Sequence, residues 1–282
     1  MSANLAVLEL SALLRSGATN KVAIKAFQFD LLTEFQKKQF QFIWDVSSDS
    51  GGNLALALDR LAQVFDSQHK QSAELKVAFA SPRASANLIL MLPLLAVIFA
   101  ELLGLPTISS AFETSLGALA VGFGLILLIV ARVISLRMLE KAKPREADPG
   151  AFLDAVVIGL SAGLSPKASS TLAQNKSVLN FGEKVSGEQL TSLQDAISVS
   201  EQSGIALTGI LSARADALRH RLWNRRRQDL AKLSISLLLP LGLAALPAFV
   251  FLAVVPLGIG LFRAVYKGIK NGLEKRHWRC HG

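Results

Sequence analysis

Residues 49–62 read DSGGNLALALDRLA, and residues 202–215 read QSGIALTGILSARA. In both stretches a Ser-Gly pair is followed by apolar residues three and four positions apart, the spacing that places side chains on one face of a helix. Each stretch is followed by basic residues and then by a long apolar run that contains Leu-Pro-Leu. We interpret the two stretches as copies of one helical module, each tied to a membrane.

The composition is typical of a membrane protein. The chain has 282 residues, of which 51% are hydrophobic and 18% are charged, with a mean hydropathy of +0.41, whereas soluble proteins carry about 25% charged residues. Three runs hold no charged residue, at 84–100, 114–131 and 233–262. Because about 20 residues of helix cross a bilayer core of about 30 Å, the sequence predicts about three transmembrane helices.

The placement of basic residues predicts the orientation. Five Lys and Arg residues lie between Arg132 and Arg145, whereas the connection 105–113 has none. By the positive-inside tendency, the first two runs form a hairpin whose tip is outside, so the N-terminus is cytoplasmic. The third run is long and contains three prolines, so it crosses once or bends back and returns the tail to the cytoplasm. The single cysteine, Cys280, fits soluble parts in a reducing compartment.

Outside the apolar runs the pattern is helical. Apolar periodicity predicts helices over 4–15 and 31–47, and Ser50 or Asn53 can cap the helix that follows. No alternating strand pattern is present, which predicts an all-α membrane protein with two repeated cytoplasmic bundles. The predicted divisions are a first bundle at 1–84, a transmembrane hairpin at 85–136, a linker at 137–150, a second bundle at 151–232, a third transmembrane segment at 233–262 and a basic tail at 263–282.

Three landmarks support the duplication. Gly17 corresponds to Gly163 at a shift of 146 (163 − 17), and Gly51 corresponds to Gly204 at a shift of 153 (204 − 51). The Leu-Pro-Leu strings around residues 93 and 240 are separated by 147 (240 − 93). Similar shifts in the same order indicate a tandem repeat. We interpret Gly51 and Gly204 as helix-breaking turns rather than ligand sites.

The basic stretch RHRLWNRRRQDLAK at 219–232 is the sharpest local feature. It precedes the third apolar run, where basic side chains bind anionic headgroups, and an acidic protein partner is the other interpretation. Nucleic acid is not expected as a partner, because these residues are held close to the bilayer. The candidate binding residues are Arg219, Arg221, Trp223, Arg225, Arg226 and Arg227.

The sequence offers little support for chemistry. It contains no GxxxxGK[ST] loop, and the string GLSAG at 159–163, which has GxSxG spacing, does not follow a strand pattern as a nucleophile elbow requires. The tail string HWRCH places His277, Cys280 and His281 together, but a mobile basic tail accounts for them. Glu101 is the only candidate for an intramembrane charge, and it lies near the expected outer end of the first run, where a carboxylate can reach water. We therefore expect no catalytic residue, no cofactor and no metal, and a protein that is not an enzyme.

The layout resembles the F-type inner-membrane platform proteins of type II secretion and type IV pilus machines, particularly the tight-adherence (Tad, Flp pilus) branch. The similarity rests on ALLRSGAT and VIGLSAGLSP, on FIWDVSSDSGGNLALALDRLA and AISVSEQSGIALTGILSARADALR, and on LLLPLGLAALPAFVFLAVVP. It covers most of residues 5–262, although the segment 21–39 has no counterpart in the second copy.

The resemblance implies a non-enzymatic, multi-pass scaffold in a prokaryotic plasma membrane. Its implied partners are a hexameric secretion ATPase, pilin subunits, and a second copy or a paralogous platform protein. Two other functions stay open from the residues. A small oligomeric channel or permease component would use the proline-bent helices, but it lacks intramembrane charge. A membrane-tethered signalling adaptor would recruit acidic partners through the basic stretch.

Overall fold

The computed structural model describes residues 2–104, 114–141 and 146–262, together with Ile108, Phe112, Val265, Tyr266 and Ile269. Within these residues the regular structure is entirely helical, which confirms the all-α prediction. The predicted outer tip, part of the linker and most of the basic tail lie outside the described residues.

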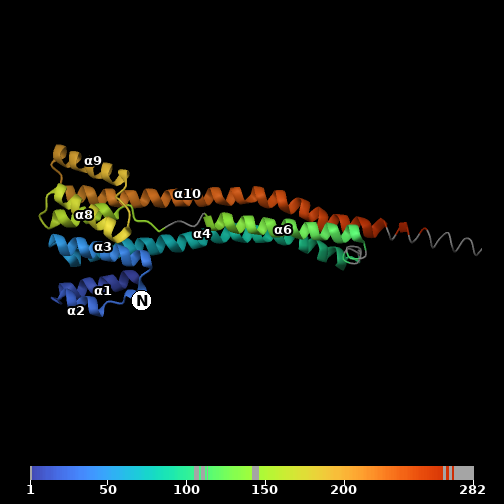
Figure 1. Cartoon of the computed structure of the whole chain (residues 1–282), viewed down its shortest axis with the longest axis horizontal. Helices are drawn as coiled ribbons and strands as arrows, with labels where there is room; N and C mark the ends of the chain where they lie inside the picture. The colour runs from blue at the N-terminus through green and yellow to red at the C-terminus, as the bar shows by residue number, and fades with distance from the viewer. Residues whose placement is uncertain are drawn as a thin grey trace, which may run out of the picture. The chain divides into compact units, whose positions relative to one another are not determined.

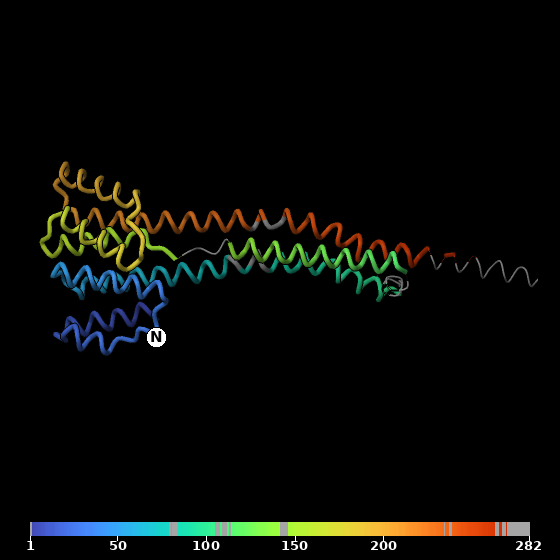
Figure 2. The backbone as a smooth tube through the Cα atoms, in the orientation of Figure 1, coloured from blue at the N-terminus to red at the C-terminus, as the bar shows by residue number. Residues whose placement is uncertain are grey.

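The chain divides into two compact units (Figures 1 and 2). Unit 1 contains residues 1–75 and 144–227, and unit 2 contains residues 76–143 and 228–282. Both stretches predicted as cytoplasmic bundles therefore contribute to a single unit. The helices that carry the apolar runs form the other unit.

The helices occur in the following order in the chain. The first half contains α1 (Ala3–Arg15), α2 (Asn20–Ala26), the 3-10 turn η1 (Phe29–Leu31), α3 (Glu34–Ser50) and α4 (Leu54–Leu102), and it is followed by α6 (Ser115–Lys141). The second half contains α7 (Ala151–Ser161), α8 (Pro166–Phe181), α9 (Gly187–Ser203), α10 (Leu207–Phe249) and the π-helical segment η2 (Val250–Val254). Because α6 continues to Lys141, the predicted linker 137–150 is helical in its first part.

Local sequence accounts for the ends of α3 and α9. Each begins with a capping box, in which Thr33 pairs with Gln36 and Ser186 pairs with Gln189. Both helices end at a glycine in the left-handed region, where glycine carries no steric cost. These glycines are Gly51, with φ of 69°, and Gly204, with φ of 70°. The Asn53 side chain then accepts a hydrogen bond from the backbone N–H of Leu56, as expected for a helix cap.

The two halves of unit 1 share one hydrophobic core. Phe42 and Leu58 from the first half lie in the same buried cluster as Leu153 and Leu211 from the second. The ring of Phe42 lies 5.4 Å from that of Phe181, measured between centroids. Each half has only about 80 residues, a size at which one hydrophobic core is marginal. Together the two halves build a single, larger core, which is no longer marginal. The two predicted bundles therefore form one structural unit rather than two.

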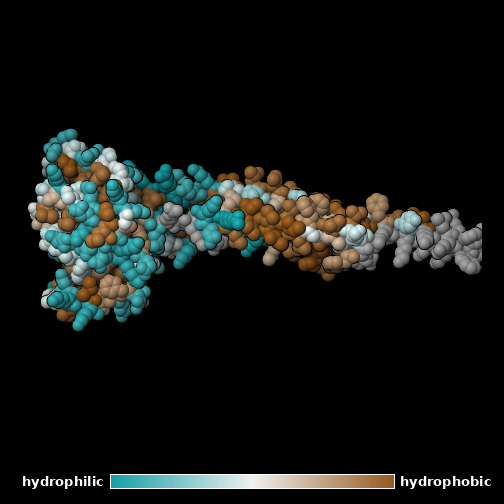
Figure 3. Space-filling view, viewed as in Figure 1, coloured by the Kyte–Doolittle hydropathy of each residue, from teal (hydrophilic) through white to brown (hydrophobic). Residues whose placement is uncertain are grey.

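Among its described residues, unit 2 contains three helices that are long and apolar enough to cross a membrane: Ala84–Leu102, Ser115–Lys141 and Leu239–Phe262. This agrees with the three apolar runs of the sequence. Hydrophobic side chains cover these helices in Figure 3, whereas unit 1 shows a mixture of polar and apolar side chains. Pro240 and Pro247 both lie inside α10 without ending it.

Close packing joins α6 to the middle of the third candidate span. Leu128 of α6 is buried together with Ala248 and Leu252, and the ring of Phe123 meets that of Phe251 edge to face at 5.0 Å. A β-carbon at Gly124 would lie 2.6 Å from Cγ of Leu252. Glycine at this position is therefore required for the approach of the two helices.

Candidate functional site: a buried ion-pair network

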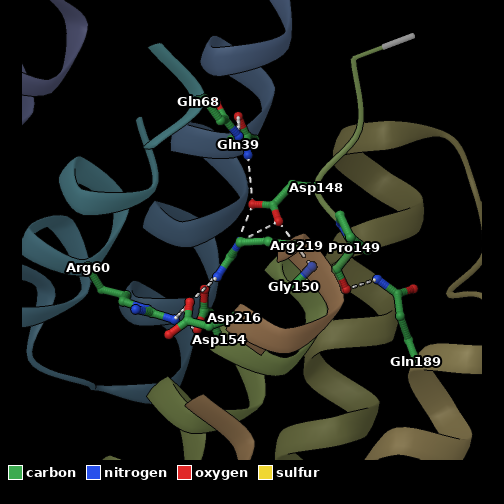
Figure 4. A network of polar contacts seen from close by, with 10 residues as sticks. All are labelled: Gln39, Arg60, Gln68, Asp148, Pro149, Gly150, Asp154, Gln189, Asp216 and Arg219. Atoms are coloured by element: carbon green, nitrogen blue, oxygen red, sulfur yellow. Dashed lines mark hydrogen bonds and ion pairs between the residues drawn. The ribbon is translucent and has the colours of Figure 1, made fainter. Parts of the chain in front are cut away.

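Arg219 of α10 is the centre of a buried ion-pair network in unit 1 (Figure 4). Its Nε lies 2.7 Å from Oδ1 of Asp148, and its Nη2 lies 3.0 Å from Oδ2 of the same carboxylate. Nη2 also donates to Oδ2 of Asp154 at 2.6 Å. The planar guanidinium thus makes a two-pronged contact with one carboxylate and a third bond to another, a geometry that lysine cannot reproduce.

Asp148 reaches Arg219 because the segment before α7 passes close to α10. The backbone N–H of Gly150 donates to Asp148 Oδ1 at 3.0 Å, and Gln39 of α3 donates to Oδ2 at 2.8 Å. A β-carbon at Gly150 would lie 2.6 Å from Cζ of Arg219 and 2.8 Å from the carbonyl oxygen of Ala215. Glycine is therefore needed for the guanidinium to fit.

Arg60 extends the network across the boundary between the two halves of the chain. Its Nε lies 3.2 Å from Oδ1 of Asp154 on α7, and its Nη2 lies 2.6 Å from Oδ1 of Asp216 on α10. Asp154 therefore bridges Arg60 of the first half and Arg219 of the second. Three carboxylates and two guanidiniums together hold α4, α7 and α10 in one arrangement.

Burial and mutual pairing set the charge states of these groups. Burial raises the pKa of Asp154, and the guanidiniums of Arg219 and Arg60 oppose this rise. For Arg219, burial alone would lower the pKa, but the carboxylates of Asp148 and Asp154 raise it above its ordinary value. The arginines stay charged, and removing Arg219 would leave the buried carboxylates of Asp148 and Asp154 without their main compensation.

A cavity of about 360 Å³ lies beside the network, within unit 1. Its walls are apolar where α4 faces α7, with Leu56, Ala57, Val157 and Ile158, and its polar side includes Arg60. The cavity thus lies along the boundary between the halves. Its lining combines packing surfaces with charges that are already paired, so the arrangement is suited to holding helices in register.

The structure separates the basic residues singled out from the sequence. Only 13% of the Arg219 side chain is exposed, and Trp223 is buried. Both differ from the exposed position expected for headgroup binding. The side chain of Arg221 is 75% exposed, and its Nη1 lies 3.9 Å from Oε1 of Glu188. Arg225 and Arg227 are also exposed.

Arg226 differs from its neighbours. It is half-buried, and burial lowers its pKa while Glu146 opposes this effect. Lipid or partner binding by the exposed arginines stays a prediction. The tail residues His277, Cys280 and His281 lie outside the described residues.

Most members of the network were not singled out from the sequence. One signal was present, because Asp154 is the only charged residue in the apolar helix AFLDAVVIGLS, at 151–161. A buried carboxylate needs a partner, so a basic counterpart elsewhere was implied. Periodicity could not show which of the many arginines would supply it, because the pairing crosses from one half of the chain to the other.

Comparison with known protein families finds a match in the first half of the chain. Residues 6–100 match the family model of protein F of the type II secretion system. The matched segment contains the helices of the first half, from α1 almost to the end of α4. No curated protein and no solved structure matches the chain.

Proposed function

We propose that this chain, which carries a type II secretion system protein F domain at residues 6–100, is the inner-membrane platform of a secretion or Tad-type pilus machine. The family match supports a membrane component of secretion machinery. The three candidate spans support membrane location. In this role the chain is a scaffold without catalytic activity, and it couples a cytoplasmic ATPase to the assembly of pilin subunits.

One observation carries the mechanical part of the proposal. Helices α4 and α10 each contribute residues to both units, because α4 covers Leu54–Leu102 and α10 covers Leu207–Phe249. Arg60 of α4 and Asp216 of α10 are joined directly by an ion pair in unit 1. A displacement of unit 1 by a motor would therefore act on both helices together. Helices are stiff elements suited to this transmission.

The proposed topology places unit 1 in the cytoplasm of a prokaryotic cell. An even number of spans between the two halves would put both halves on one side of the membrane, which agrees with their shared core in unit 1. The basic residues from Arg132 to Arg145, at the end of α6 and just after it, favour the same side. The N-terminus is then cytoplasmic, in reach of an ATPase.

Deletion with complementation tests the proposal. A strain that lacks the gene should lose assembled fibres or secreted substrate, and the wild-type chain should restore them. Affinity purification of the tagged chain from membranes should recover a hexameric ATPase. Normal secretion and normal fibres in the deletion strain, with no paralogue present, would contradict the proposal. Solute flux through liposomes that contain only the purified chain would favour a channel instead.

A further inference from the structure

Unit 1 is built in layers, and its two outer layers are the first part of the first half and the later part of the second half. In Figure 1, α1 and α2 lie at one edge, α3 and α7–α8 lie between, and α9 lies at the opposite edge. Contacts join α3 to α7 and α8, and α7 to α9. The second half is therefore stacked on the first, and each edge of the stack is uncovered.

Local hydrogen bonds indicate which residues correspond between the halves. After α1, the N–H of Gly17 donates to the carbonyl of Leu14, and after α7 the N–H of Gly163 donates to that of Leu160. This matching pair of turns supports a shift of 146 (163 − 17) between α1 and α7.

The turns that follow α3 and α9 correspond in the same way. The Ser47 hydroxyl donates to the carbonyl of Gly52, and the Ser200 hydroxyl donates to that of Ile205. The shift is 153 (200 − 47) from α3 and α4 to α9 and α10. Residues at the uncovered edges can therefore be matched with residues inside the stack.

Two of the close contacts across the covered interface can be followed to the uncovered edges. Asp154 of α7 pairs with Arg60 of α4, as described above. Four residues further along α7, Ile158 packs over Gly52, where an added β-carbon would lie 3.0 Å from Cγ2 of the isoleucine. One contact is thus an ion pair, and the other sets a large side chain against glycine.

At the uncovered edges, other residues stand at the positions that correspond to these two contacts. In each contact both partners differ together. Asp154 corresponds to Leu8 and Arg60 corresponds to Ala213, so both charges of the ion pair are replaced by apolar side chains. Leu8 is 41% exposed, although it lies in unit 1 and outside the three candidate spans. If only one of the two charges had been replaced, a stacked edge would bury an unpaired charge.

In the second contact the large and the small side chain change places. Ile158 corresponds to Ala12, and Gly52 corresponds to Ile205, so the large residue lies on the other side. Ile205 is 58% exposed, and Ala12 is exposed as well. A large side chain opposite a small one preserves the fit when both change together.

A third pair of the covered interface has no equivalent at the uncovered edges. Lys176 of α8 pairs with Asp49 of α3 at 2.7 Å. Asp49 corresponds to the uncharged Gln202 of α9, and the position that corresponds to Lys176 is residue 30, which lies beyond the end of α2. This ion pair is therefore not expected between copies. The inference rests on the first two contacts, in which both partners change together.

We propose that the α1–α2 edge of one copy of this chain packs on the α9–α10 edge of a second copy, repeating the stacking seen inside unit 1. The interface is head-to-tail, because each copy contributes a different surface. Such an interface builds closed rings or open arrays. The inference rests on unit 1 alone and not on the proposed function.

A disulfide experiment tests the contact in isolated membranes. In a Cys280→Ser background, Ala12→Cys is placed on one tagged copy and Ile205→Cys on a co-expressed copy with a different tag. The corresponding pair inside unit 1 is Ile158 and Gly52, where an added β-carbon would lie 3.0 Å from Cγ2 of the isoleucine. This approach suits a disulfide, in which the two β-carbons lie about 4 Å apart. Mild oxidation should give a dimer that carries both tags.

Matched controls make the result specific. A head-to-tail contact predicts no dimer when either cysteine variant is expressed alone. It also predicts none when the Ala12→Cys copy is co-expressed with a copy that carries Ser48→Cys, at an exposed position on α3. Absence of the two-tag dimer, or equal dimer formation by a single variant, would overturn the proposal. Neither result depends on whether the cell secretes or assembles fibres.

A charge exchange provides a second, independent measurement. Leu8→Asp or Ala213→Arg alone should weaken self-association of the purified chain about tenfold or more, because an unpaired charge would be buried. Leu8→Asp on one copy with Ala213→Arg on the other should restore it, since the pair recreates the contact of Asp154 and Arg60. Leu179→Asp, at an exposed leucine of the inner layer, is the control. A monomeric wild-type chain, or no restoration by the pair, would contradict the interface.

Discussion

Arg219 and Asp148 form a two-pronged ion pair, with Nε 2.7 Å from Oδ1 and Nη2 3.0 Å from Oδ2. The carboxylate side chain is only 3% exposed. The pair ties α10 to the segment that enters α7, so it closes the second half of unit 1. Because both groups are buried, their geometry matters more than that of the exposed arginines further along α10.

Replacing Arg219 should destabilise unit 1 strongly. Arg219→Ala leaves the carboxylates of Asp148 and Asp154 buried without their main partner, which costs roughly 3–5 kcal/mol of unfolding free energy. Arg219→Lys should recover only part of this loss, because an ammonium cannot make the two-pronged contact. Thermal unfolding of the detergent-purified chain measures both. Arg221→Ala, at an exposed site, should change stability by no more than about 0.5 kcal/mol, and an equal loss in both alanine variants would contradict this account.

Gly150→Ala should also be destabilising, for a steric reason. The new methyl group would lie 2.6 Å from Cζ of Arg219, and overpacking of this kind costs about 1–3 kcal/mol. Gly187→Ala is the matched control, since nothing lies within 4 Å of a β-carbon there. The same unfolding measurement should show a loss for the first variant and little change or a gain for the second. Identical behaviour of the two would be evidence against the close approach.

The capping boxes of α3 and α9 should contribute similarly to stability. Thr33→Ala and Ser186→Ala each remove the side chain that accepts a backbone N–H of the first turn, at a cost of about 0.5–2 kcal/mol. Chemical unfolding of the two variants should show losses of the same order. Ser48→Ala, at an exposed position inside α3, should have a smaller effect. A loss confined to one of the two caps would argue against equivalent roles in the two halves.

In unit 2, Gly124 and Leu252 should behave as a coupled pair. Gly124→Ala places a methyl group against Cγ of Leu252 and should lower thermal stability in detergent by about 1–3 kcal/mol. Combining it with Leu252→Ala opens space for that methyl group, so the double variant should lose less than the sum of the two single losses. Gly122→Ala, which meets nothing within 4 Å, is the control. Additive losses would show that the two residues do not interact.

Cys280, the only cysteine of the chain, can report the side of the tail. With a cytoplasmic N-terminus and three crossings, a membrane-impermeant maleimide should label Cys280 in intact spheroplasts. In a Cys280→Ser background, Ser48→Cys should be labelled only after permeabilisation, because unit 1 is cytoplasmic in the proposed topology. Labelling of Cys280 that also requires permeabilisation would instead favour a third run that returns to the cytoplasm.

The helices and turns of unit 1 were predictable because their signals are local. The glycines at 51 and 204, the cap at Asn53 and the apolar face of α3 all act within a few residues of their own positions. The three apolar runs were predictable for the same reason, since span length and lack of charge can be read directly. By contrast, the network around Arg219 was only hinted at by the isolated Asp154.

By itself, the sequence determined the helical class, the order of the elements and the apolar segments suited to a membrane. Only the tertiary structure decided that the two halves share one core, and that Arg60 and Arg219 meet at Asp154. It also showed that Arg219, which was expected on a basic surface, has only 13% of its side chain exposed. The physical reason is the range of the interactions. Helix formation and membrane partition depend on neighbouring residues, whereas the pairing of buried charges depends on which distant segments pack together.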